Sequence, residues 1–232
     1  MLASLRRDFH AQASPERALA SQRYFKTGPG QYGEGDKFLG LTVPQTRSFL
    51  PRTDALAEAD IVTLLHSEWH EERLLALLAL VRRFEKARRD EAARQRIVTL
   101  YLANTRWINN WDLVDTSAPQ ILGGWLLDRD RSLLGKLARS PGLWERRIAV
   151  LATLNFIRAG QFNDTLDLCR QLLSDRHDLV HKACGWMLRE VGNRDESALI
   201  GFLDVHAAEL PRTMLRYAIE KLSPARRQHY MR

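Results

Sequence analysis

Residues Trp107 to Gly124 read WINNWDLVDTSAPQILGG and combine two tryptophans and two acidic residues with an apolar run. Asparagine is a favoured helix cap, and the two asparagines before Trp111 predict a helix that begins near that residue. Trp111 and Asp115 then share one helix face, a large π surface one turn from a carboxylate. Asp112 lies on another face, where we expect it to close the first turn or pair with an arginine.

The same pattern has a purely structural alternative, in which Trp111 packs in a core and Asp115 pairs with an arginine. Structural ion pairs are common, so the spacing alone does not decide between this alternative and a functional site. The rest of the chain supplies the context.

The segment NWDLVDTSAP (110–119) has four similar segments elsewhere in the chain. They are EERLLALLAL (71–80), ERRIAVLATL (145–154), VHKACGWMLR (180–189) and PRTMLRYAIE (211–220). Alignment of Arg73, Trp111, Arg147, Lys182 and Thr213 gives spacings of 38, 36, 35 and 31 residues. A helix that recurs at this period, followed each time by an antiparallel partner, is typical of a helical solenoid of HEAT-like repeats.

Apolar residues recur at helical spacing through nearly all of the chain, and no segment alternates as a strand does. The predicted helices are 2–12, 15–26, 44–50, 54–65, 68–85, 91–103, one from 111, 131–139, 143–158, 163–173, 178–191, 197–206 and 211–222. Residues 27–40, TGPGQYGEGDKFLG, contain five glycines and predict a loop. The expected fold class is therefore all-α, with about twelve helices.

We expect residues 1–232 to form a single domain, with N-terminal helices and the glycine-rich loop preceding repeats from about residue 54. Equivalent helices of a curved solenoid line one wall. Trp111, Arg147 and Lys182 are equivalent in the repeat alignment, and Asp115 and Trp186 lie one turn further along. All five are expected to approach one groove, which is cationic, aromatic and holds one carboxylate.

The composition, 45% hydrophobic and 27% charged, is that of an ordinary globular protein. The longest apolar runs are too short to span a bilayer, and the charged start MLASLRRDFHAQ is unlike a secretory signal. Neither Cys169 nor Cys184 belongs to a CxxC motif, so we expect two buried, reduced thiols in a cytoplasmic protein.

The net charge of +7 comes with 29 arginines against 6 lysines. Guanidinium groups bind phosphate oxygens in pairs, so an arginine-rich cationic surface suits nucleic acid. A GC-rich genome would enrich arginine without any functional cause, and charge alone leaves that alternative open.

His66 and His70 stand four residues apart, the spacing of two metal ligands on a helix. They lack the HExxH order of a zinc site, and we expect no metal and a solvated helix start there.

Three separated motifs resemble the AlkD-type DNA alkylation-repair glycosylases, which are built of HEAT-like repeats. The motifs are WDLVD (111–115) with the following APQILG, LWERRIAVL (143–151) and KACGWMLRE (182–190). The segments RYFK, FLGLTVPQTR and PRTMLRYAIEKL add to a resemblance that covers nearly the whole chain. The glycine-rich segment between Lys26 and Phe38 is longer than in the best-known members.

The resemblance implies that Asp115 is the catalytic carboxylate and that Trp111 and Trp186 are aromatic walls beside the deoxyribose of the lesion. It implies a phosphate contact for Arg147 and a place at the DNA face for Tyr24. The repeat alignment adds Lys182 to the expected DNA-binding residues.

The expected function is hydrolysis of the N-glycosidic bond of cationic N3- or N7-alkylated purines in duplex DNA. We expect a monomer that uses no cofactor and works in the cytoplasm, at the nucleoid when bound to DNA. Two alternatives remain open. One is a non-catalytic solenoid that recognises distorted or branched DNA, and the other is a HEAT scaffold that binds an acidic protein through its tryptophans.

Overall fold

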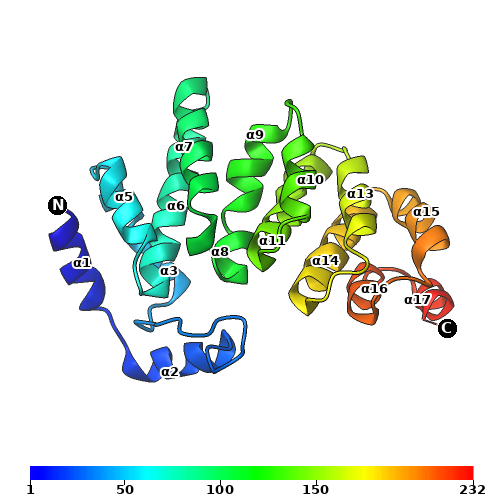
Figure 1. The fold of residues 1–232 in the computed structure, drawn as a ribbon, viewed down its shortest axis with the longest axis horizontal. Helices are drawn as coiled ribbons and strands as arrows, with labels where there is room; N and C mark the ends of the chain where they lie inside the picture. Colours follow the sequence, from blue (N-terminus) through cyan, green and yellow to red (C-terminus); the bar gives the residue numbers. More distant parts are fainter. Residues whose placement is uncertain (232) are drawn as a thin grey trace. The chain divides into compact units, whose positions relative to one another are not determined.

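The computed structural model describes residues 1–231, and their regular structure is helical, apart from one isolated β-bridge between Lys37 and Trp69. The all-α prediction is confirmed. The chain divides into two compact units, Met1–Ser117 and Ala118–Arg232, coloured blue to green and green to red in Figure 1. The prediction of one domain over 1–232, like that of one groove lined by residues of both units, stays a prediction.

The first unit is built around α6 (His70–Lys86), in which every side chain from His70 to Leu80 is buried. A helix that is buried on all sides over this stretch needs neighbours around it. It contacts α3, α4, α5, α7 and α8, and Figure 1 shows α5, α6 and α7 side by side. The other elements of this unit are α1 (Leu2–His10), α2 (Pro15–Tyr24), α3 (Val43–Ser48), α4 (Leu50–Thr53), α5 (Glu58–Leu65), α7 (Glu91–Ala103), the 3₁₀ turn η1 (Thr105–Trp107) and α8 (Trp111–Asp115).

The second unit is built around α14 (Asp178–Arg194), which contacts α11, α12, α13, α15 and α16. Gly185 lets α14 approach α16 closely, because a Cβ there would lie 2.5 Å from the carbonyl oxygen of Met214. Cys169 and Cys184 are buried and free, as predicted. The other elements are the π-helical turn η2 (Pro119–Gly123), α9 (Gly124–Leu126), α10 (Ser132–Ala138), α11 (Leu143–Ala152), α12 (Leu154–Arg158), α13 (Asn163–Gln171), α15 (Glu196–His206), α16 (Arg212–Ala218) and α17 (Pro224–Tyr230).

The five similar sequence segments each fall on a helix, namely α6, α8, α11, α14 and α16. Their assignment to the HEAT type stays a prediction. The predicted loop at 27–40 is confirmed, with Gly40 at φ 82°, a conformation that favours glycine.

Three of the differences from the predicted helix boundaries are the largest. The predicted helix 143–158 breaks at Thr153, whose hydroxyl donates to the carbonyl of Val150 at 2.7 Å and so competes with the helical backbone pattern. The helix predicted from Asp54 begins at Glu58, because residues 54–57 form the turn that follows α4, with Asp54 as the C-cap residue of α4. The helix predicted to reach residue 222 ends at Ala218.

The helix α17 was not predicted. Ser223 caps it and Pro224 opens it, the same start signal that correctly predicted α2 at Ser14 and Pro15.

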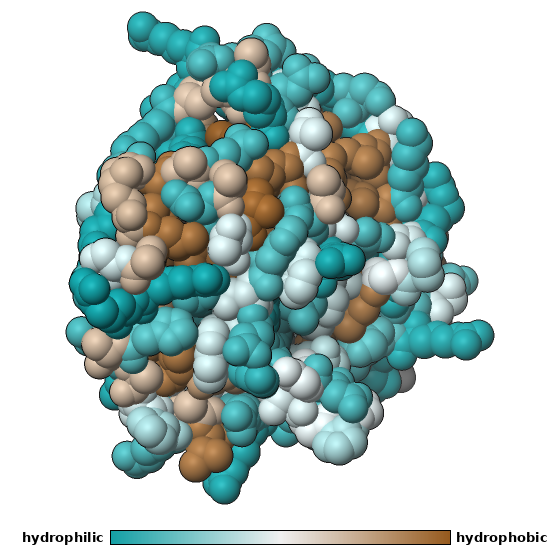
Figure 2. Space-filling view, turned by 60° about the vertical axis from the view of Figure 1, so that its left-hand side comes forward, coloured by the Kyte–Doolittle hydropathy of each residue, from teal (hydrophilic) through white to brown (hydrophobic). Residues whose placement is uncertain are grey.

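Most large apolar side chains are buried, and hydrophilic residues cover most of the face shown in Figure 2, with separate hydrophobic areas between them. The large hydrophobic residues left exposed are Met1, Leu19, Tyr24, Val43, Val205 and Tyr217. No helix in residues 1–231 combines the length and the apolar character of a membrane span.

Candidate functional site

The helix α8 presents the predicted tryptophan and carboxylate at its two ends. The buried side chain of Asn110 caps it, accepting from the Trp111 amide at 2.9 Å, as the sequence predicted. Leu113 and Val114 are fully buried and fix the helix to the unit, while Trp111 and Asp115 stay partly exposed. A π surface and a carboxylate are therefore held one turn apart at the edge of a packed helix.

Aromatic rings of α2 and its C-terminal end surround Trp111. Phe25 stacks on Trp111 with ring centroids 5.3 Å apart and an angle of 22° between the planes. Tyr24 meets the same indole edge-on at 5.8 Å and is 65% exposed. On the other side of the stack, Phe25 lies against Phe38 at 5.1 Å. The structure thus brings Tyr24 and Trp111 together, two of the residues selected from the sequence.

A buried charged cluster lies beneath this stack. His70 Nδ1 is 2.8 Å from Asp36 Oδ2, and His70 Nε2 is 2.8 Å from Asp112 Oδ2. Arg73 binds the other oxygen of Asp36. Burial lowers the pKa of His70, but the charges of Asp112 and Asp36 outweigh it and raise the pKa to about 9. The ring is therefore protonated at neutral pH.

This cluster corrects the expectation that Asp112 closes the first turn of its helix or pairs with an arginine. Its partner is His70. The nearby buried arginine, Arg73, donates instead to Asp36 and to the carbonyl of Ser67.

The two histidines considered as metal ligands have other partners. Both ring nitrogens of His70 face carboxylates. His66 Nε2 lies 2.5 Å from Asn104 Oδ1, and its ring stacks on Trp107 at 4.9 Å. The two side chains thus serve separate contacts.

The carboxylate of Asp115 is close enough to Tyr101 to influence its ionisation. Burial and the charge of Asp115 raise the pKa of Tyr101, whose hydroxyl lies 3.1 Å from Ser117 Oγ. Tyr101 therefore stays a neutral, fully buried phenol beside α8.

In the second unit, α14 carries a row of four polar or aromatic side chains, each one turn from the next. Lys182 pairs with Asp178 at 2.9 Å, and Trp186 donates from its indole to Glu190 at 3.0 Å. Because residues at i and i+4 share a face, Lys182 and Trp186 lie on one side of this helix.

Arg147 of α11 is only 5% exposed, and its guanidinium donates to the carbonyl of Leu179 at 2.5 Å. It ties α11 to the first turn of α14. The neighbouring Arg146 binds Asp175 at 2.6 Å.

Beside Lys182 the second unit has a cavity of about 880 Å³ with a basic lining. Its cationic residues are Lys182, Arg212, Arg216 and Arg227, and its acidic ones are Asp178 and Glu220. Positive charge is in excess, which suits a polyanionic partner.

The family model for DNA alkylation repair enzymes matches residues 5–222. The chain belongs to the DNA alkylation repair enzyme family. It is thus an enzyme of DNA repair, and DNA is the partner that membership implies. The chain is similar in fold to a solved structure, a predicted DNA alkylation repair enzyme from Enterococcus faecalis. The TM-score is 0.70 at 15% identity, over 92% of this chain and 98% of the other. A comparison with curated proteins found no match.

In this DNA alkylation repair enzyme, the residues selected from the sequence fall into two sets. Tyr24, Trp111 and Asp115 lie in the first unit, and Arg147, Lys182 and Trp186 lie in the second. Their functional roles stay predictions.

Sequence reasoning missed several side chains of these two regions. The contact between His70 and Asp36 had no local signal, because the two side chains come together across 34 residues of chain. Arg216 and Arg227 could have been noticed, since Arg212 and Arg216 are one turn apart and Arg227 follows the Ser223–Pro224 helix start.

Proposed function

We propose that the protein is a DNA glycosylase that hydrolyses the N-glycosidic bond of cationic N3- or N7-alkylated purines in duplex DNA, acting as a monomer. The observation that carries the proposal is the pair Trp111 and Asp115, held one turn apart and partly exposed on the capped helix α8. Membership in a DNA alkylation repair family gives this pair its chemical context.

The proposed reaction needs few catalytic groups from the protein. An alkylated purine carries a positive charge, which weakens the bond to the sugar, so its departure needs no protonation by a general acid. The sugar becomes oxocarbenium-like in the transition state, and the Asp115 carboxylate stabilises this cation and orients the attacking water. The faces of Trp111 and Trp186 stabilise a cationic ring by about 0.5–2 kcal/mol each. This reaction needs neither a metal nor a cofactor.

The DNA backbone is proposed to contact the second unit. Lys182 lines the basic cavity, and α14 carries Trp186 one turn further along the same face. Arg147 is proposed as a phosphate contact. The Arg147 guanidinium donates to the carbonyl oxygen of Leu179 at 2.5 Å and makes other contacts. A phosphate would therefore be bound by an arginine that is packed within the second unit.

The decisive experiment is release of N3- and N7-methylpurines from duplex DNA by the purified protein. We expect base release at a rate well above spontaneous depurination. Binding to undamaged duplex that falls with salt, without base release, would instead indicate a non-catalytic DNA-binding protein. Absence of both would favour a protein-binding scaffold.

Replacement of Lys182 or Arg147 by Ala is expected to weaken duplex binding and to lower the salt dependence by about one counterion each. Arg147→Ala should also lower the melting temperature, because the carbonyl of Leu179 loses a donor. Fluorescence titrations at several salt concentrations measure both effects. Arg170→Ala, which removes an exposed cation of α13 paired with Asp167, is the matched control and should leave the salt slope unchanged. A parental slope in Arg147→Ala with a lowered melting temperature would make Arg147 a structural residue.

A further inference from the structure

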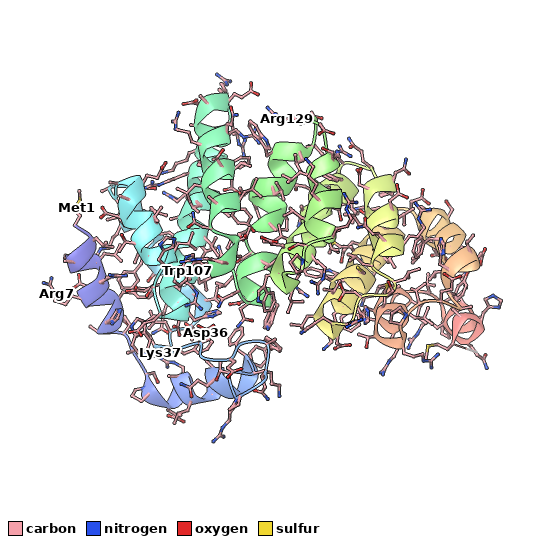
Figure 3. The ribbon with its side chains drawn as sticks, in the orientation of Figure 1. Met1, Arg7, Asp36, Lys37, Trp107 and Arg129 are labelled. Carbon is pink, nitrogen blue, oxygen red and sulfur yellow. The ribbon has the colours of Figure 1, made fainter. Side chains whose placement is uncertain are left out.

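Three separate segments of the first unit meet at the ring of His70. Asp36 comes from the glycine-rich loop, Asp112 from α8, and His70 is the first residue of α6. The side chains of His70 and Asp36 are each 2% exposed, and that of Asp112 is 14% exposed. Figure 3 shows Asp36 where the loop passes the start of α6. The ring is thus a buried junction between the loop and α8.

The junction acts on α8 at its first turn. Asp112 directly follows Trp111, and its contact with His70 attaches that turn to α6. The cap by Asn110 closes the same turn by accepting from the Trp111 amide. A helix of five residues has few backbone hydrogen bonds of its own, so its orientation depends on side-chain contacts, here the contact of Asp112 together with the burial of Leu113 and Val114.

The same ring also supports the aromatic stack. Phe38 stacks on His70 with centroids 4.6 Å apart, and Phe25 lies 4.9 Å from His70. Phe25 in turn covers one face of Trp111. His70 therefore contacts Asp112, which follows Trp111 in the sequence, and Phe25, which stacks on the Trp111 ring.

Protonation decides whether both carboxylates have a donor. A protonated imidazole donates from Nδ1 and Nε2 together, whereas a neutral one has a single N–H. The charged groups that face the ring are Asp36 from the loop and Asp112 from α8, with Arg73 behind Asp36. Lys37 contributes its backbone carbonyl to the His70 amide, and its ammonium pairs with Glu68 at the surface.

We propose that His70 is a positioning residue for base excision: its ring holds Asp36 with one nitrogen and Asp112 with the other, and so fixes Trp111 against Phe25 with Asp115 one turn beyond. This inference rests on the proposed glycosylase function. The side chain of His70 is 2% exposed, so in this role it acts through Asp112 and Phe25.

The test replaces His70 by Gln, which keeps a polar side chain of similar length but donates to one carboxylate only. Single-turnover base release, measured on the folded fraction, is expected to fall about tenfold. Excision by the parental protein should also fall as the pH rises through about 9, where His70 loses its proton, and the variant should lack that step. A residue that only stabilises the fold would leave the shape of this pH profile unchanged.

The chain offers a matched control in His10→Gln. His10 Nε2 lies 2.8 Å from the buried carboxylate of Glu72, so this variant also removes a histidine–carboxylate contact to α6. It should keep the parental excision rate and the parental pH profile. If His70→Gln fails to fold, Asp112→Asn takes its place, and the step near pH 9 should move to lower pH because one carboxylate charge is removed.

A measurement that does not depend on base excision tests the positioning role of His70 separately from the glycosylase function. In the parental protein, nitrogen NMR of His70 and the indole signal of Trp111 are expected to titrate together between pH 7 and 10. A Trp111 indole signal that stays unchanged while His70 titrates would overturn the positioning role, whether or not the protein excises bases. Parental excision by folded His70→Gln would overturn it as well. A protein without base release whose two signals titrate together would overturn only the glycosylase function.

Discussion

Replacement of Asp115 by Asn is expected to slow excision of a methylated purine about a hundredfold. The change keeps the shape of the side chain and removes its charge. If that charge stabilises the oxocarbenium-like sugar, its loss costs about 2.7 kcal/mol in the transition state, the scale for one preorganised electrostatic contact. Single-turnover base release with excess enzyme measures the chemical step directly.

Duplex affinity distinguishes this effect from a loss of binding. Asp115→Asn should bind duplex as well as the parental protein or better, because a negative charge near the phosphates is gone. Asp167→Asn, which neutralises an exposed carboxylate of α13, is the matched control and should change neither rate nor affinity. A folded Asp115→Asn protein that excises at the parental rate would contradict the catalytic assignment. A loss of about 1–3 kcal/mol of stability with a normal rate would make Asp115 structural.

The short-range features of the site could be predicted from the sequence. The cap by Asn110, the helix that starts at Trp111 and the loop at 27–40 all depend on residues within a few positions of one another. The buried cysteines follow equally from their apolar neighbours on helical patterns. Local propensity and periodicity suffice for such features.

The partners of charged side chains could not be predicted in this way. Asp112 binds a histidine 42 residues earlier in the chain. Asp36 lies in a glycine-rich loop, where no helical or strand periodicity indicates which side chains are buried. The repeat alignment gave Arg147 and Trp111 equivalent positions. Trp111 is partly exposed, whereas Arg147 is 5% exposed and binds the carbonyl of Leu179. Equivalence along the sequence therefore fixes the helix on which a residue lies, but neither its exposure nor its partner.

The end of the glycine-rich loop depends on one buried carboxylate. Glu71, 3% exposed, accepts hydrogen bonds from the amides of Leu39, Gly40 and Leu41 at 2.9, 2.8 and 3.2 Å. Hydrogen bonds to a charged acceptor contribute about 1.5–3 kcal/mol each, and buried amides without an acceptor are costly. This carboxylate therefore joins the loop to α6 at a point where the backbone has no helical partner.

Glu71→Gln is expected to lower the free energy of unfolding by about 3 kcal/mol. The amide oxygen can still accept from Gly40 and Leu41, but the amide nitrogen then faces the N–H of Leu39, and two donors cannot bond. For a chain of this size the melting temperature should fall by about 10 °C. Glu68→Gln is the matched control, since it removes a carboxylate that is 58% exposed and paired with Lys37, and exposed pairs contribute about 0–1 kcal/mol. Equal melting temperatures for the two variants would mean that solvent, rather than Glu71, satisfies the three amides.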